Sequence, residues 1–118
     1  MSSHGAVASY ALGEDVWNAV VADWRTAPLG PELHATLAFI EQLTLRPDEL
    51  TPADASRVYD AGVSKQALLD AATVCALFNM ITRLADALGW DVPSPERLAA
   101  RAPAMLEGGY ALTAVGKR

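Results

Sequence analysis

The sequence predicts an all-α protein, and three observations support that class. Alanine and leucine dominate, whereas aromatic residues make up only 7% of the chain and β-branched residues are sparse. Several segments begin with a capping residue followed by proline, the combination favoured at helix starts. Apolar residues recur three and four positions apart rather than in alternation. Because 118 residues suffice for one core, we expect a single domain spanning residues 1–118.

Capping signals place the predicted helices along the chain. Gly30-Pro31, Thr51-Pro52 and Ser94-Pro95 each pair a cap with a proline, Ser64 is a further N-cap, and Gly62 closes the helix before it. The helices expected from these signals are 4–12, 14–25, 31–45, 52–61, 65–89 and 95–101. The tail from Pro103 onward contains Gly108-Gly109 and ends in Gly116-Lys117-Arg118. It is expected to be a docking or frayed segment rather than a helix.

The fifth predicted helix is the centre of the expected fold. Its run from Ala71 to Leu77 is apolar on nearly every side, and charged residues follow at Arg83 and Asp86. A helix that is apolar all round must be enclosed by other elements, and a short chain has few of them. We therefore expect about six helices around a long, buried central helix, 65–89, and a homo-oligomer in which another copy supplies part of the cover.

Two further helices carry apolar stripes that are expected to face the core. In the second helix the stripe has helical spacing, and so has the stripe of the third helix. The stripe residues are Trp17, Val20, Val21 and Trp24 in the second helix, and Leu33, Leu37, Phe39, Ile40, Leu43 and Thr44 in the third.

Charge and cysteine content exclude several classes of partner. The net charge is −5 and no Lys/Arg cluster is present, which argues against a nucleic-acid surface. The single cysteine, Cys75, excludes an internal disulfide and a zinc site built on paired cysteines. The uncharged stretch 71–82 is shorter than the roughly 18 to 20 residues that span a bilayer, and no leader opens the chain. We expect a cytoplasmic protein without membrane contact, metal or cofactor.

Few side chains suggest chemistry by their spacing. There is no glycine-rich phosphate loop, no Ser/His/Asp arrangement and no histidine pair at metal-ligand spacing. Cys75 in the apolar helix is expected to be a buried structural thiol rather than a nucleophile. Asn79 and Arg83 must find partners on a mostly buried helix: either Asn79 bonds backbone while Arg83 pairs with an acid across an interface, or the two line a binding surface.

Several stretches together resemble the alkylhydroperoxidase AhpD-like family, also called the carboxymuconolactone decarboxylase family, in its peroxidase-related branch. The resemblance runs from about residue 3 to about residue 106, and the long helix is its most specific part. The stretches that carry it are Ser3-His4-Gly5, 23–29, 39–44, 61–64 and 76–89. The resemblance implies an all-helical protein that forms dimers, trimers or hexamers.

The resemblance also implies an antioxidant oxidoreductase chemistry. Redox-active members carry a C-x-x-C-x-x-x-H segment in which one cysteine attacks peroxide, the other resolves it, and the histidine relays protons with an upstream glutamate. His4 falls at the histidine position, and both redox cysteines and the glutamate are missing from this sequence. The chain as given is therefore expected to lack thiol peroxidase activity, with His4 as the only catalytic residue that the family pattern assigns.

Two explanations for the missing motif stay open. The chain is either a short homologue that kept the scaffold and lost the chemistry, or Met1 is an internal methionine of a longer protein, so that the domain is incomplete at its N-terminus. The coding sequence upstream of Met1 distinguishes them.

The functional alternatives follow from this ambiguity. One is a peroxidase-related scaffold acting on peroxide or another small molecule. The other is a non-catalytic helical oligomer that binds a small apolar ligand or a protein partner near Cys75, Asn79 and Arg83. Lactone decarboxylation ranks last, because no general acid or base for it is located in the sequence.

Overall fold

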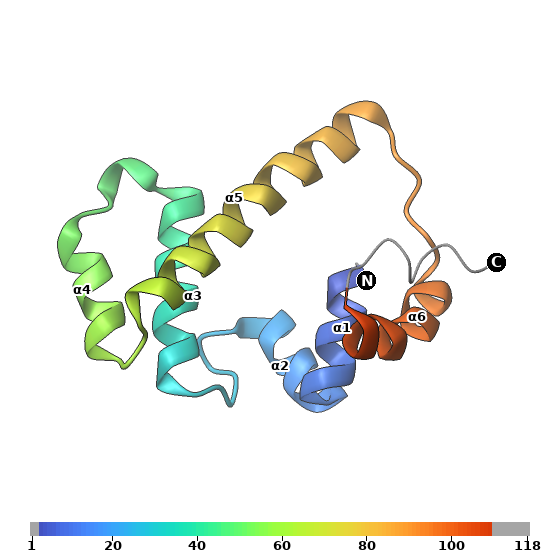
Figure 1. Cartoon of the computed structure of the whole chain (residues 1–118), viewed down its shortest axis with the longest axis horizontal. Coiled ribbons are helices and arrows are strands. Elements are labelled where there is room, and N and C mark those ends of the chain that lie inside the picture. The colour runs from blue at the N-terminus through green and yellow to red at the C-terminus, as the bar shows by residue number, and fades with distance from the viewer. Residues whose placement is uncertain (1–2, 110–118) are drawn as a thin grey trace. The chain divides into compact units, whose positions relative to one another are not determined.

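The computed structural model describes residues 3–109, which form six α-helices and one short 3-10 helix and contain no strand (Figure 1). The all-α prediction is confirmed. The elements are α1 (Ser3–Leu12), α2 (Glu14–Asp23), α3 (Pro31–Leu45), η1 (Pro47–Glu49), α4 (Pro52–Asp60), α5 (Lys65–Leu88) and α6 (Pro95–Gly108). The chain divides into two compact units, one formed by the residues up to Pro28 and from Asp91 onward, the other by Leu29–Trp90. Each unit is described by itself.

The predicted helix starts are confirmed. Pro31, Pro52 and Pro95 each occupy the first turn of a helix. Ser64 caps α5, because its hydroxyl oxygen accepts a hydrogen bond from Ala67 N at 3.1 Å. The end of α5 is equally well defined: Gly89 adopts φ 62° and ψ 42°, a left-handed conformation that glycine reaches without a steric penalty.

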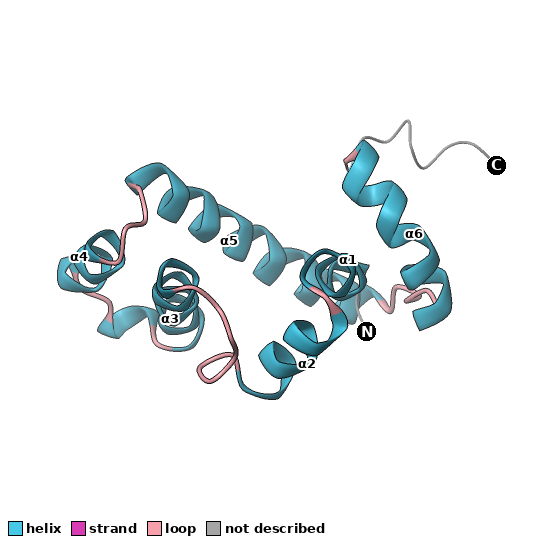
Figure 2. Ribbon diagram, turned by 90° about the horizontal axis from the view of Figure 1, so that it is seen from below, coloured by secondary structure: helices cyan, strands magenta, loops and turns pink. Residues whose placement is uncertain are grey.

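In the first unit, α1 packs against both α2 and α6, an arrangement visible in Figure 2. Its core is small and consists of Ala6, Leu98 and Ala102, with Val7 packed against them. Small side chains at Ala6 and Ala102 let α1 and α6 approach closely, and Leu98 fills the space between them.

Helix α6 is longer than the sequence indicates. It was expected to end at residue 101, before Pro103, but it continues through Pro103 to Gly108. The physical reason is packing: Leu98 and Ala102 are buried against α1, and this burial offsets the backbone hydrogen bond that proline cannot make. The tail after Gly109 lies outside the described residues.

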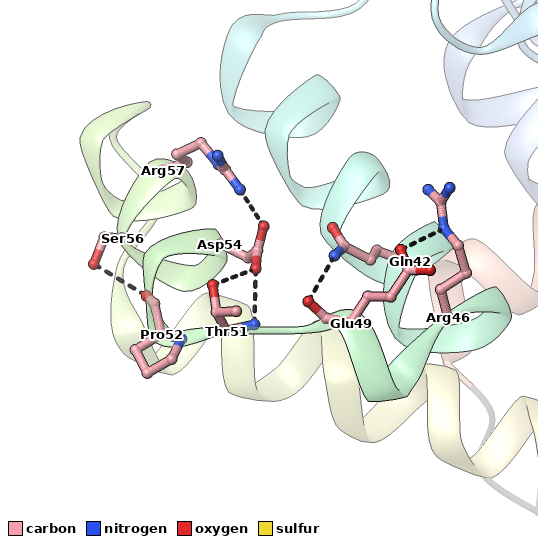
Figure 3. Close-up of polar contacts among 8 residues, drawn as sticks. All are labelled: Gln42, Arg46, Glu49, Thr51, Pro52, Asp54, Ser56 and Arg57. Carbon is pink, nitrogen blue, oxygen red and sulfur yellow. Dashed lines mark hydrogen bonds and ion pairs between the residues drawn. The ribbon is translucent and has the colours of Figure 1, made fainter.

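In the second unit, α3 contacts α4, α5 and η1. Val58 of α4 and Leu68 of α5 are its buried apolar residues. Figure 3 shows the polar contacts around α4. The carboxylate of Asp54 accepts hydrogen bonds from the Thr51 N–H at 2.8 Å and the Thr51 hydroxyl at 2.7 Å, and it also contacts Arg57. This arrangement fixes the start of α4.

Within one copy of the chain, helix α5 is not the buried central helix that was expected, and cover by a second copy stays a prediction. Helix α5 has formed almost as predicted, over 24 residues, yet Leu68 is its only buried residue. The neighbours of α5 in its unit explain this, since α3 is the helix that packs along it and covers one side. One helix covers only part of another's circumference, so the remaining apolar side chains of α5 stay exposed.

The two apolar stripes are also less buried than predicted. No residue of α2 or α3 is buried, and Val21 is 65% exposed. Helix α2 ends at Asp23 rather than at residue 25, because Asp23 O accepts a hydrogen bond from Thr26 N at 3.2 Å and the chain turns there. Arg25 then lies over the Trp24 ring, 4.8 Å from its centroid.

The length and composition of α5 would suffice to cross a membrane, although only 6% of the apolar window within it is buried. The uncharged stretch 71–82 alone is too short to span a bilayer, but the apolar window within α5 is longer and includes charged residues. Core helices of globular proteins pass the same test, so the absence of membrane contact stays a prediction.

Candidate functional site on helix α5

Three predicted site residues lie four positions apart on α5 and therefore on one side of it. They are Cys75, Asn79 and Arg83. Asn79 Nδ2 donates to Cys75 O at 3.0 Å and to Cys75 Sγ at 3.3 Å. Arg83 Nη1 donates to Asn79 O at 2.7 Å and to Asn79 Oδ1 at 3.0 Å. The structure thus brings the three side chains into one continuous set of contacts.

A fourth member, Thr44 of α3, joins this set across the helix pair. Its hydroxyl oxygen lies 3.2 Å from Cys75 Sγ and 2.8 Å from Ile40 O. The sequence pattern placed Thr44 on the apolar stripe of α3 and missed this role. A signal was available, because a threonine at the last position of an apolar stripe carries a hydroxyl that has to be satisfied.

Each hydrogen bond among these residues has a defined donor and acceptor. The Thr44 hydroxyl has one hydrogen, which is directed to Ile40 O, so the thiol of Cys75 donates to Thr44 Oγ1. Asn79 uses its amide hydrogens toward Cys75, and its Oδ1 accepts from Arg83. Reversing the amide would set NH₂ against the guanidinium and oxygen against a carbonyl, so its orientation is fixed. We call these four residues, Thr44, Cys75, Asn79 and Arg83, the polar chain.

The polar chain gives the only thiol of the protein a structural task. Cys75 is half-buried rather than buried as predicted, because α3 covers one side of α5 only. Its S–H links α5 to α3, and its sulfur accepts from Asn79. A nucleophilic thiol must instead give up its hydrogen to a base. The contacts of Cys75 are with a hydroxyl and an amide, and neither group is a general base at neutral pH.

One part of the expectation for Asn79 and Arg83 is confirmed: Asn79 bonds backbone, at Cys75 O of its own helix. Within this chain Arg83 contacts the carbonyl and the side chain of Asn79. A guanidinium four residues on from an asparagine reaches it without leaving the helix surface. The pairing of Arg83 with an acid across an interface stays a prediction.

His4 belongs to the other unit, in the first turn of α1, where it is exposed and Gly5 and Ala6 next to it are buried. Helix α1 therefore positions His4 independently of the polar chain. His34 is half-buried near the start of α3.

A second polar cluster surrounds Asp54 and is local. The hydroxyl and N–H of Thr51, together with Arg57, lower the pKa of Asp54 to about 2. Next to it, Gln42 Nε2 donates to Glu49 O at 3.5 Å and Arg46 lies 3.6 Å from Glu49 (Figure 3). All of these contacts fix turns and helix ends around η1 and α4, and we assign this cluster a structural role.

Fold and site together define an all-helical protein whose one thiol is held in a hydrogen-bonded chain between two helices. Within residues 3–109, no group of three or more His, Cys, Asp or Glu side chains is placed to hold a metal ion. No model of a known protein family matches the chain, and no curated protein matches it.

Proposed function

We propose that this chain is a non-catalytic helical module that assembles with copies of itself through α5. One observation carries the proposal: α5 is two-sided. The polar chain ties one side of the helix to α3, whereas large apolar side chains, among them Leu77 and Leu84, stay exposed on the other. Exposed apolar surface of this kind is typical of interaction sites.

The polar chain supports a binding role rather than a catalytic one. Thr44, Cys75 and Asn79 are engaged with one another. Arg83 stands at its exposed end, and Nη1 is the nitrogen used in its contacts with Asn79. A guanidinium carries further donors on its other nitrogens, which suit a carboxylate or other anionic group of a ligand or partner. We propose that such binding takes place in the cytoplasm.

Analytical ultracentrifugation at micromolar concentration tests the assembly, and a peroxide-consumption assay with a dithiol reductant tests the absence of catalysis. We expect a dimer or larger species that consumes no peroxide above the rate of the dithiol alone. A monomer at all concentrations would overturn the proposed assembly, and peroxide turnover that Cys75→Ser abolishes would overturn the structural assignment of the thiol.

A second candidate function, thiol-dependent peroxide reduction of the alkylhydroperoxidase type, is favoured by the position of His4. It lies near the start of α1, and the family resemblance places the whole C-x-x-C-x-x-x-H segment near the start of a helix. In this proposal the cysteines come from residues encoded upstream of Met1. An upstream-extended protein should then consume peroxide, and His4→Gln should reduce its rate. Equal, zero activity of the extended and given chains would reject this candidate.

A further inference from the structure

The exposed side of α5 carries a seven-residue repeat. Val74, Ile81 and Leu88 are seven positions apart, and Leu77 and Leu84 are seven apart and interleave with them. All five side chains are between 44% and 63% exposed. These are the a and d positions of a heptad, with β-branched residues at the first two a positions and leucine at d, the combination that favours two-stranded coiled coils. We call these five residues the seam.

The seam and the polar chain lie on opposite sides of α5. With Val74 at position a, Cys75 occupies position b and Asn79 occupies position f of the same heptad. Both positions lie on the face that is turned away from the partner helix in a coiled coil. Because the contact with Thr44 of α3 uses that face, packing in the unit leaves the seam exposed. A partner helix on the seam would not have to displace α3.

We propose that the seam of α5 pairs with the seam of α5 in a second copy of this chain, the two helices being related by a two-fold axis. The inference rests on the proposed self-association and names its surface. A second α5 is the partner helix that fits, because the seam is complementary to itself. Apolar side chains at a and d positions pack against a helix with the same spacing, and α5 carries that spacing over two heptads.

The area of the seam agrees with this occupant. At their exposed fractions, the five seam residues together with Met80 and Phe78 beside them present on the order of 600 Å². That approaches the ~800 Å² each partner gives to a standard interface and exceeds the ~400 Å² of most packing contacts.

The residues flanking the seam predict how the pair responds to salt. The flanking e and g positions hold Ala71, Phe78 and Ala85 on one side and Thr73, Met80 and Ala87 on the other, none of them charged. Coiled coils usually place ion pairs at these positions. Here pairing relies on apolar burial, so its affinity should not fall between 0.05 and about 0.5 M salt.

The test compares matched leucine-to-glutamate variants of the full chain by sedimentation equilibrium. The double variant Leu77→Glu, Leu84→Glu puts a charge on both d positions, and we expect its dimer to be weaker by about 100-fold or more. Leu69→Glu is the control, because Leu69 is 60% exposed on the same helix but lies off the seam. Its dissociation constant should stay within about threefold of that of the unmodified chain.

Two further measurements keep the outcome unambiguous. Far-UV circular dichroism checks that each variant stays helical. The double variant Leu77→Ala, Leu84→Ala is milder, and we expect it to weaken the dimer by less than the glutamate double variant does and by more than Leu69→Glu does. A dimer that all seam variants leave unchanged overturns this inference, and self-association then takes place through a surface other than the seam. A monomeric unmodified chain overturns both. A chain that instead floats as a monomer with phosphatidylcholine and phosphatidylglycerol vesicles also overturns the inference, because the seam then faces lipid.

Discussion

Asn79 and Arg83 are joined by two contacts from a single nitrogen: Arg83 Nη1 donates to Asn79 O at 2.7 Å and to Asn79 Oδ1 at 3.0 Å. The second contact sets the orientation of the Asn79 amide, whose nitrogen then reaches Cys75. An exposed arginine thereby fixes how a half-buried asparagine presents itself to the thiol, and through the thiol to α3.

The coupling between Asn79 and Arg83 should be measurable. We expect a double-mutant cycle of Asn79→Ala and Arg83→Ala, followed by urea unfolding, to give a coupling free energy of about 0.5–1 kcal/mol. The pair Arg83→Ala and Thr73→Ala is the control, because Thr73 bonds Leu69 O on the same helix and does not belong to the polar chain. A coupling no larger than that of the control pair would show that the contact contributes nothing.

Cys75 should tolerate serine better than alanine. Serine retains a donor for Thr44 Oγ1 and an acceptor for Asn79 Nδ2, whereas alanine removes one hydrogen bond from each of the two groups. We expect Cys75→Ala to lower the free energy of unfolding by about 1 kcal/mol more than Cys75→Ser does. The opposite order would mean that the thiol acts as a plain apolar side chain.

The cap of α5 depends on one hydroxyl. Removing it in Ser64→Ala loses the hydrogen bond from Ala67 N, and we expect a loss of about 1 kcal/mol in the free energy of unfolding. Ser56→Ala makes a suitable control, since Ser56 bonds Pro52 O within α4 and caps nothing. Equal effects of the two substitutions in chemical denaturation would argue against a special role for Ser64.

Acid should destabilise the protein in part through Asp54. The pKa of this carboxyl is lowered in the folded chain to about 2, chiefly by the hydroxyl of Thr51, so the carboxylate stabilises the fold above its unfolded pKa of roughly 4. That stabilisation is lost as the pH falls from about 4 toward 2. Asp54→Asn should therefore melt below the unmodified protein at pH 6, and the two should converge near pH 2.

Glu96 does not confuse this comparison. Its pKa is also lowered, by the Ser94 hydroxyl, but it contributes equally to both proteins and cancels in the difference between their melting temperatures. A difference that stays constant between pH 6 and pH 2 would contradict the assignment to Asp54.

The end of α5 should respond to any side chain at position 89. A Cβ there meets no atom within 4 Å, so the cost of Gly89→Ala is conformational, about 1 kcal/mol for a left-handed residue. Asparagine tolerates this conformation better than alanine, and Gly89→Asn should recover part of the loss. Thermal unfolding of both variants checks the order.

The helix starts, and the end of the helix before Gly62, were predictable because their signals are local. Ser64, the three cap–proline pairs and Gly62 each act within a few residues, and the structure confirms them. Burial was not predictable in the same way, because it depends on which helices meet. The periodicity of α2 is correct as a pattern, yet Val21 is 65% exposed, because the packing of α1 against α2 covers only part of that helix.

The candidate site was partly predictable for the same reason. Cys75, Asn79 and Arg83 follow from their spacing on one helix, whereas Thr44 lies 31 residues from Cys75 and is found only once α3 and α5 are packed. The extension of α6 past Pro103 is a similar case, since the burial of Leu98 and Ala102 against α1 decides it.

The start and the stop of α5 both lie within residues 64–90, because Ser64 begins the helix and the N–H of Trp90, bonded to Ala85 O at 3.0 Å, closes it after Gly89. A synthetic peptide of these residues would thus contain every group that sets the ends of the helix, and it would span about 36 Å when folded. Such a fragment would present the whole of α5, seam included, as a competitor for the partner that α5 binds, and its design requires no knowledge of the rest of the protein.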